Sequence, residues 1–341
     1  MKRPEPLSAV AALFAALVLA SCASAPRAQL TEEEPGREFA ALDPGALVYL
    51  IVDVPAARPI LDLVSFDGGM LRSGLPPAIL DRTGTAVAAV YPPGMGRRFL
   101  VAAEGRFPAA RARFSFAFSS SWKKVSSPAG KRYWRSAREG LSVSLDSRSA
   151  RVSDGDPYAA AGGVLAPDAF GPLRRGAALA GWIENAAAPI GRFLERLRIP
   201  LQIPADRAIF GVYAVPPPAA PAYGDGSVAG GDLPGHGVGE ESRYRRAVAA
   251  GSGEEKPRYE AVLRIETSSP SHARGLIAMV SLLRNFLDTG ADAGPDSPVA
   301  LIAALLANPP VQEDSALILR SSDMDCESVA LLFNLFSVYS N

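Results

Sequence analysis

The chain has 341 residues, with 35 basic and 35 acidic side chains. Because these charges balance, no overall field selects nucleic acid or an acidic substrate, and any recognition of charge must be local. The length suggests two domains or one large domain, with enough chain to bury a sizeable core. We therefore predict no nucleic-acid partner.

The first 22 residues have the pattern of a secretion signal. Lys2 and Arg3 form a positive segment, the apolar run VAALFAALVLA follows at residues 10–20, and small residues precede Cys22. The run has 11 residues, which is too short for a helix to cross a hydrocarbon core of roughly 30 Å. An ordinary cleaved signal, whose cysteine stays free or pairs with Cys326, is the alternative interpretation.

Leu19-Ala20-Ser21-Cys22 resembles the lipobox of bacterial lipoproteins, and this resemblance covers only the first 22 residues. It implies a diacylglycerol thioether on Cys22, cleavage before that cysteine, and acylation of the new amine. The predicted location is therefore the cell envelope, where the protein is attached to a membrane through the lipid on Cys22. By the sorting rule of that family, Ala23 rather than aspartate after the cysteine favours the outer membrane.

The chain divides into four segments by composition. Residues 1–21 form the signal peptide, and residues 22–44 form a polar tether that spans about 25 Å as a flexible chain. A first α+β unit is expected at residues 45–155 and a second at residues 156–341. The second unit contains an insertion at 215–257, dense in proline, glycine and charge, for which we predict disorder; a lid or partner-binding loop is the alternative.

Short strands and helices alternate along both units. In the first, strands are predicted at 46–52, 85–91 and 98–104, helices at 59–64 and 108–118, and three closing strands near 132–135, 141–145 and 150–153. In the second, helices are predicted at 270–287 and from 298, a strand at 315–319, and a buried C-terminal helix at 326–339.

Similar segments recur in the same order in both units. The strand after Gly45 is echoed after Gly176, residues 86–91 are echoed by 208–213, and Arg98-Phe99 by Arg258-Tyr259. Each unit would run strand, helix, strand, strand, helix, strand, which is the split βαβ order of ferredoxin-like folds. We therefore predict an α+β fold with two duplicated ferredoxin-like units, whose antiparallel sheets lie side by side or merge, plus the C-terminal helix.

No sequence motif indicates an enzyme or a metal site. The histidines are His236 and His272, and no H-E-x-x-H or C-x-x-C spacing occurs. Asp53 and Glu184 end the two equivalent first strands, where they could converge as an acid and a base, although solvated strand-end charges are the simpler interpretation. We predict no catalytic residue, no metal and no cofactor.

Residues 122–138 (WKKVSSPAGKRYWRSAR) contain six cations and no acid, with Pro128-Ala129-Gly130 as a turn. Cations beside aromatic rings suit phosphate or carboxylate groups, a lipid headgroup region or a glycan. A plain hairpin, with rings packed inward and cations in water, explains the same pattern. The predicted binding residues are Trp122, Lys123, Lys124, Lys131, Arg132, Tyr133, Trp134 and Arg135.

Together these features predict a lipid-anchored, extracytoplasmic envelope protein that acts as a binding or structural module. Its expected partner is an envelope protein, an anionic lipid or the cell wall. One alternative is the solute-binding lipoprotein of a transporter, although such proteins have long alternating βα units that this chain lacks. The other is a carboxylate-dependent hydrolase.

Overall fold

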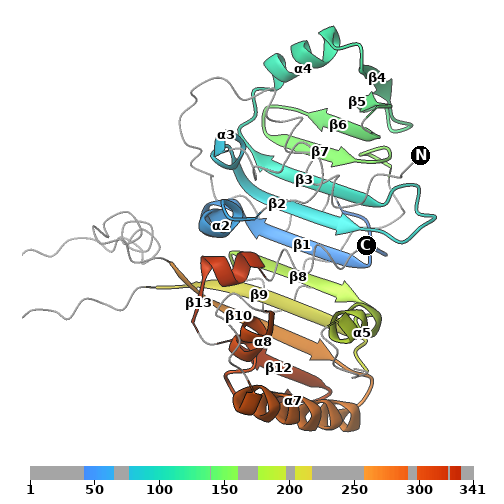
Figure 1. Cartoon of the computed structure of the whole chain (residues 1–341). Coiled ribbons are helices and arrows are strands. Elements are labelled where there is room, and N and C mark those ends of the chain that lie inside the picture. The colour runs from blue at the N-terminus through green and yellow to red at the C-terminus, as the bar shows by residue number, and fades with distance from the viewer. Residues whose placement is uncertain are drawn as a thin grey trace, which may run out of the picture.

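The computed structural model describes residues 42–64, 77–138, 140–159, 176–196, 204–216, 257–290, 298–321 and 323–331. Cys22, nearly all of the predicted tether and insertion, and the end of the C-terminal helix lie outside these residues. Within them the protein is a mixed α+β structure built on one 13-stranded sheet, in which all pairings are antiparallel (Figure 1). The coarse part of the predicted fold is therefore confirmed.

The first half of the chain supplies seven of the strands. Its elements are β1 (Val48–Asp53), α2 (Val54–Leu61), α3 (Pro77–Leu80), β2 (Thr83–Val90), β3 (Phe99–Gly105), α4 (Ala109–Phe118), β4 (Trp122–Ser126), β5 (Arg132–Ser136), β6 (Leu141–Leu145) and β7 (Ser149–Ser153). The second half contributes β8 (Leu179–Glu184), α5 (Ala187–Arg196), β9 (Arg207–Val215), β10 (Arg258–Glu266), α7 (Pro270–Gly290), α8 (Pro298–Leu305), β11 (Val311–Glu313), β12 (Ala316–Arg320) and β13 (Met324–Asp325). Residues 326–331 begin the predicted C-terminal helix.

The two halves join where the first strand of each half pairs with the other. β1 and β8 run antiparallel, with Val48 opposite Ile183 and Val52 opposite Leu179. From this seam the order continues as β1-β2-β3-β7 on one side and β8-β9-β10-β12 on the other. The predicted sheets are thus merged into one, and the order of strands beside the seam is the same in both directions.

The strand order does not confirm the ferredoxin-like units. A split βαβ unit has a further strand between the two strands that its first helix connects, and these two run parallel. Here β1 pairs directly and antiparallel with β2, and β8 does so with β9. The order of strands and helices was therefore predicted more closely than the strand pairing. A short helix between two strands is compatible with a parallel pair separated by a third strand, but also with the adjacent antiparallel pair that is found here.

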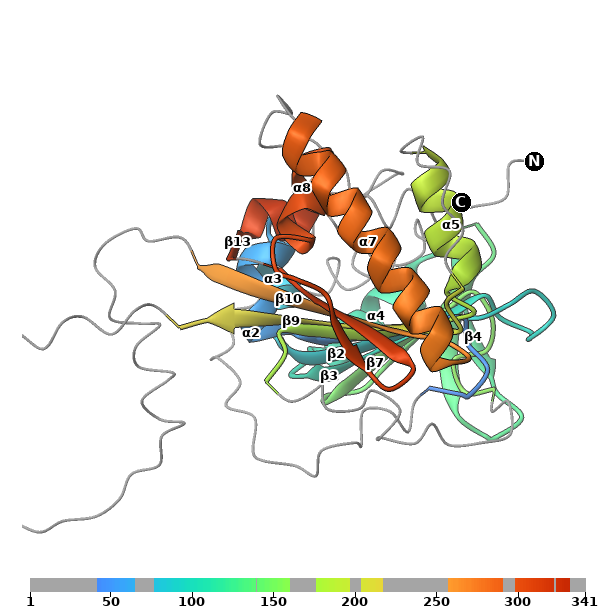
Figure 2. The same ribbon diagram turned by 90° about the horizontal axis from the view of Figure 1, so that it is seen from below.

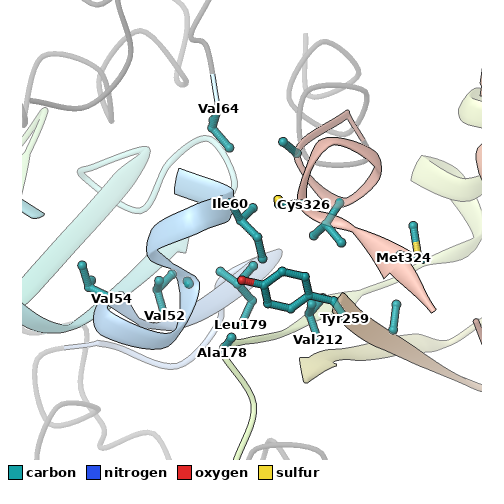
Figure 3. Close-up of a cluster of buried hydrophobic side chains, with 14 of the residues drawn as sticks. Val52, Val54, Ile60, Val64, Ala178, Leu179, Val212, Tyr259, Met324 and Cys326 are labelled. Carbon is teal, nitrogen blue, oxygen red and sulfur yellow. The ribbon is translucent and has the colours of Figure 1, made fainter. Parts of the chain in front are cut away.

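In the described segments the helices pack against one face of the sheet, which we call the helix face. α2, α3 and residues 326–330 cover the centre, α4 covers the β3–β7–β6 region, and α5, α7 and α8 cover the second half (Figure 2). Tyr259 of β10 reaches across the seam in the central cluster, and its hydroxyl lies 3.5 Å from the carbonyl oxygen of Ala56 in α2 (Figure 3). Burial raises the pKa of Tyr259 to about 12.

The opposite face of the sheet is covered at its centre by the segment that enters β1. Tyr49 and Tyr91 are buried here, and the Tyr49 hydroxyl donates to the carbonyl oxygen of Asp43 over 3.0 Å. The amide of Asp43 donates to the Tyr91 hydroxyl over 3.0 Å, and its carboxylate pairs with Arg97. Burial raises the pKa of both tyrosines. The first described residues are thus fixed on this face.

The insertion connects two strands that are already aligned at their ends. Val215 lies opposite Arg258 in the β9–β10 pairing, as the sequence comparison of the two units expects. We predict that replacing residues 216–257 by a short glycine-containing turn leaves the body folded, because loop length enters closure entropy only logarithmically. Thermal unfolding tests this: the midpoint should stay within about 5 °C of the parent, and a collapse of the midpoint would mean that the insertion is packed.

Candidate binding surface

The hairpin predicted at residues 122–138 is formed by β4 and β5, which span residues 122–136 and are the last two strands at one end of the sheet. β4 and β5 pair from Trp122 opposite Ser136 to Ser126 opposite Arg132. The turn closes because the amide of Ser127 donates to the carbonyl of Lys131 over 2.8 Å. Gly130 has φ +72°, a left-handed conformation that a glycine adopts without steric cost. We call residues 122–136 the cationic hairpin.

The two tryptophans of the cationic hairpin hold it against α4. Their ring centroids lie 4.8 Å (Trp122) and 5.8 Å (Trp134) from the ring of Phe116, which is buried. Tyr133 points to the opposite face, where burial raises its pKa, helped by the charge of Asp156 and opposed by that of Arg135. The aromatic members of the predicted site are therefore packing residues, as the plainer interpretation of the sequence expects.

The cationic members of the predicted site are all exposed: Lys123, Lys124, Lys131, Arg132 and Arg135. In the part of the chain that the structure describes, none of them has an ion pair within 4.0 Å. Lys123 lies directly opposite Arg135, so two like charges share one cross-strand position. Such a pair is destabilising unless an anion neutralises it.

The register divides these cations between the two faces of the hairpin. Across the strands, Arg135 pairs with Ser142, Ser142 with Ser153, and Ser153 with Leu100. Leu100 belongs to the buried cluster on the sheet face away from the helices. Lys123 and Arg135 therefore belong to that face. Arg132 and Lys124 alternate with them and share the side of the tryptophans. The hairpin thus has a charged end rather than a single charged face.

Sequence reasoning missed two exposed rings beside the hairpin. Phe114 and Phe118 of α4 are 65% and 76% exposed, and their centroids lie 4.4 Å apart. The signal was the spacing: residues 114 and 118 share one side of a helix, whereas Phe116 lies on the other. α4 contacts β4, and α4, β4 and β5 lie together at one end of the sheet (Figure 1). The exposed cations and the exposed rings therefore belong to the same end of the molecule.

Two arginines of the second half, on strands β9 and β10, are paired with acids within the protein. Arg207 lies 3.3 Å from Glu184 and 3.8 Å from Glu266. Arg264 lies 3.2 Å from Glu266 and 2.9 Å from Glu313. These pairs link β8, β9, β10 and β11 across the second half of the sheet.

The carboxylates considered from the sequence as an acid–base pair do not converge. Asp53 ends β1 and accepts from the amide of Ala56 at the start of α2, over 3.2 Å. Glu184 ends β8, and its amide donates to the carbonyl of Leu47, before the start of β1. Because β1 and β8 are antiparallel, the two acids lie at opposite ends of the seam, so the convergence considered as an alternative does not occur.

The remaining polar candidates give no further site. Among the described residues no group of three or more His, Cys, Asp or Glu side chains is arranged to hold a metal ion. His272 is exposed and bonded to Ser268, whereas His236 lies outside the described residues. Cys326 is a buried free thiol whose pKa is raised by burial. Of the helices in the described segments, none has the length and apolarity to span a membrane.

Comparison with known proteins identifies a fold but no family. No family model and no curated protein matches the chain. Crystal form III of TP0453 matches 90% of this chain and 99% of its own, with 14% identity and a TM-score of 0.50. Crystal form I of the same protein matches with 13% identity and a TM-score of 0.47, over 89% and 98% of the two chains. The similarity to form III indicates a related fold and nothing about activity.

The opposed charges in the hairpin give a stability prediction. Lys123→Glu places an acid directly opposite Arg135 and should stabilise the protein by roughly 0.2–1 kcal/mol, because an opposite-charge pair replaces a like-charge pair. Urea unfolding at low salt measures this gain. Lys131→Glu in the turn is the matched control and should show a smaller effect; equal effects of the two substitutions would mean that the cross-strand pair carries no special repulsion.

Proposed function

We propose that this protein is a lipid-anchored envelope protein whose α4–β4–β5 end binds an anionic lipid surface. The observation that carries the proposal is the set of five exposed cations, none with an ion pair to a described residue, beside the exposed rings of Phe114 and Phe118. Cations attract lipid phosphates within about a Debye length, and apolar rings enter the headgroup boundary. The function is binding, without catalysis, metal or cofactor.

The lipobox-like segment supports the same proposal from the other end of the chain. Lipid on Cys22 would hold the body near a bilayer, which raises the local concentration of headgroups around the cationic hairpin. A weak surface interaction is then sufficient, because the anchor supplies most of the membrane affinity. We place the protein at the outer membrane, on the sorting rule that the lipobox resemblance implies for Ala23.

We also propose that the two halves of the chain arose by duplication of one unit. Both halves have the same strand order away from the β1–β8 seam, and the segments that resemble one another occupy corresponding strands. We infer two copies of one antiparallel unit. Among the described residues, the cationic hairpin belongs to the first copy. In the second, β11 and β12 lie at the sheet end and carry the ion-paired Glu313 and Arg320.

Charge neutralisation tests the binding surface. Replacing Lys123, Lys124, Lys131 and Arg132 by Gln in the unlipidated mature chain should weaken binding to anionic vesicles by about 100-fold or more, since each cation near such a surface contributes about 1 kcal/mol. Vesicle co-sedimentation at low salt measures this loss, and moderate salt should abolish binding of the parent. Replacing Arg258, Arg274 and Arg284 of the second half is the control and should have little effect.

The aromatic pair separates a lipid partner from a soluble anionic polymer. Phe114→Ser with Phe118→Ser should weaken vesicle binding and leave any binding to anionic cell-wall fragments unchanged, because only a bilayer accepts the rings. If the parent shows no salt-sensitive binding to vesicles, the proposal is wrong. Binding to cell-wall fragments alone would identify the cell wall as the partner and would overturn the lipid assignment.

The anchor is tested separately from the binding surface. Cys22→Ala should leave an unlipidated precursor or soluble form of normal fold, because the lipobox cysteine is the proposed site of the thioether and precedes the described residues in the sequence. Detergent partitioning of the parent and the variant, with labelling by radioactive palmitate, measures the change. A variant that is still labelled and still partitions into detergent would refute the lipobox assignment.

A further inference from the structure

We propose that the acidic run Glu32-Glu33-Glu34 of the tether docks on Lys123 and Arg135 of the cationic hairpin and competes there with the anionic partner. This intramolecular contact, which we call the brake, would inhibit binding until a sufficiently anionic surface displaces the acidic run from the hairpin. This inference rests on the proposed function, since it regulates the same surface.

The hairpin lacks an acid of its own. Residues 106–138 form a stretch of 33 residues with nine cations and no acid. Lys123 and Arg135 face one another across β4 and β5 on the face opposite the helices. The five hairpin cations have no ion pair with any described residue. An acidic segment that reaches this position would relieve the repulsion of the like-charged pair.

The tether enters the body on that same face. Asp43 is 7% exposed and is held by Tyr49, Tyr91 and Arg97 on the opposite face. Arg97 also donates to the carbonyl oxygen of Asp156, over 3.3 Å. The charge of Asp156 in turn acts on Tyr133 in the hairpin. A short series of neighbouring residues therefore connects the entry point of the tether with the hairpin.

The distance between the two places follows from the sheet register. One cross-sheet row runs from Tyr49 through Ala89, Leu100, Ser153 and Ser142 to Arg135, and ends at Lys123. At about 4.8 Å between neighbouring strands, five steps place Arg135 about 24 Å from Tyr49, and six steps place Lys123 about 29 Å away.

The tether is long enough to cover this distance. From Asp43 back to Glu34 is nine residues, because 43 − 34 = 9, and nine residues reach at most about 30 Å when extended. Glu32 is two residues further and reaches about 36 Å. Because the two sites belong to one chain, their contact is intramolecular, and weak ion pairs contribute more to occupancy than they would between separate molecules.

Glu32-Glu33-Glu34 suits the hairpin better than the acids of the insertion do. It is a run of three acids, with Arg37 as the only cation between it and Asp43. In the insertion, Glu240 and Glu241 are followed by Arg243, Arg245 and Arg246, so the segment has little net charge. The insertion also leaves from the ends of β9 and β10, in the other half of the sheet (Figure 1).

Zero-length carbodiimide crosslinking of residues 22–341 with Cys22→Ser, followed by mass spectrometry, detects the contact directly. We expect Glu32, Glu33 or Glu34 to be joined to Lys123 at low salt, and the crosslink to be lost when salt screens the charges. Crosslinks to Lys123 from Glu240, Glu241, Glu254 or Glu255 instead, or none from the tether, would overturn the proposal.

Vesicle binding measures the brake. Glu32→Gln, Glu33→Gln and Glu34→Gln together should tighten binding to vesicles of anionic phospholipid several-fold. The charge-matched control, Glu241→Gln with Glu254→Gln and Glu255→Gln, should change binding much less; equal effects in both variants would refute the brake. The two proposals fail separately: a tether crosslink without vesicle binding contradicts the proposed function alone, whereas vesicle binding without a tether crosslink contradicts the brake alone.

Discussion

The antiparallel pairing of β1 with β8 is the interaction on which the rest of the structure depends. Without it the protein would have two sheets, each with an exposed edge strand at the point where the halves now meet. With it, one sheet extends from β4 to β11, and the central cluster of the helix face includes residues of both halves. Tyr259 is an example, because it belongs to β10 in the second half and its side chain contacts α2 in the first.

This single sheet also separates two kinds of surface. Since the helices of the described segments cover one face, the opposite face is left to short segments such as residues 42–47, which are held by Tyr49, Tyr91 and Arg97. Along that face, the arginines of the second half and the cations of the first half differ in whether an acid lies beside them. Arg264 and Arg207 are paired with acids in the second half, whereas Lys123 and Arg135 oppose one another in the first.

Local sequence patterns predicted most of the elements in both halves. The strands at β2, β3 and β12 and the helices α4, α7 and α8 lie within a few residues of their predicted positions. Pairing beyond the hairpins was not predicted, because it depends on contacts between residues far apart in the chain and on the register that buries one face. Direct pairing of β1 with β2, instead of the split βαβ arrangement, is the main consequence.

For the candidate site, composition located the hairpin but not the role of each residue. The rule that rings pack inward was enough to predict the positions of Trp122 and Trp134. The division of the cations between two faces required the register of β4 and β5. Phe114 and Phe118 were missed because the sequence analysis predicted a helix at 108–118 without assigning its buried side, although three phenylalanines at every second residue cannot share one side of a helix.

Amide hydrogen exchange of the lipidated protein on vesicles tests the central claim most directly. On vesicles with anionic lipid, amides of α4, β4 and β5 should exchange more slowly than on neutral vesicles, while those of β9, β10 and β12 should be unchanged. The neutral vesicles keep the anchor in place, so the comparison isolates the contribution of the cationic end. Equal exchange of residues 109–136 on both kinds of vesicle, or protection confined to the second half, would contradict the proposal that this end binds the lipid surface.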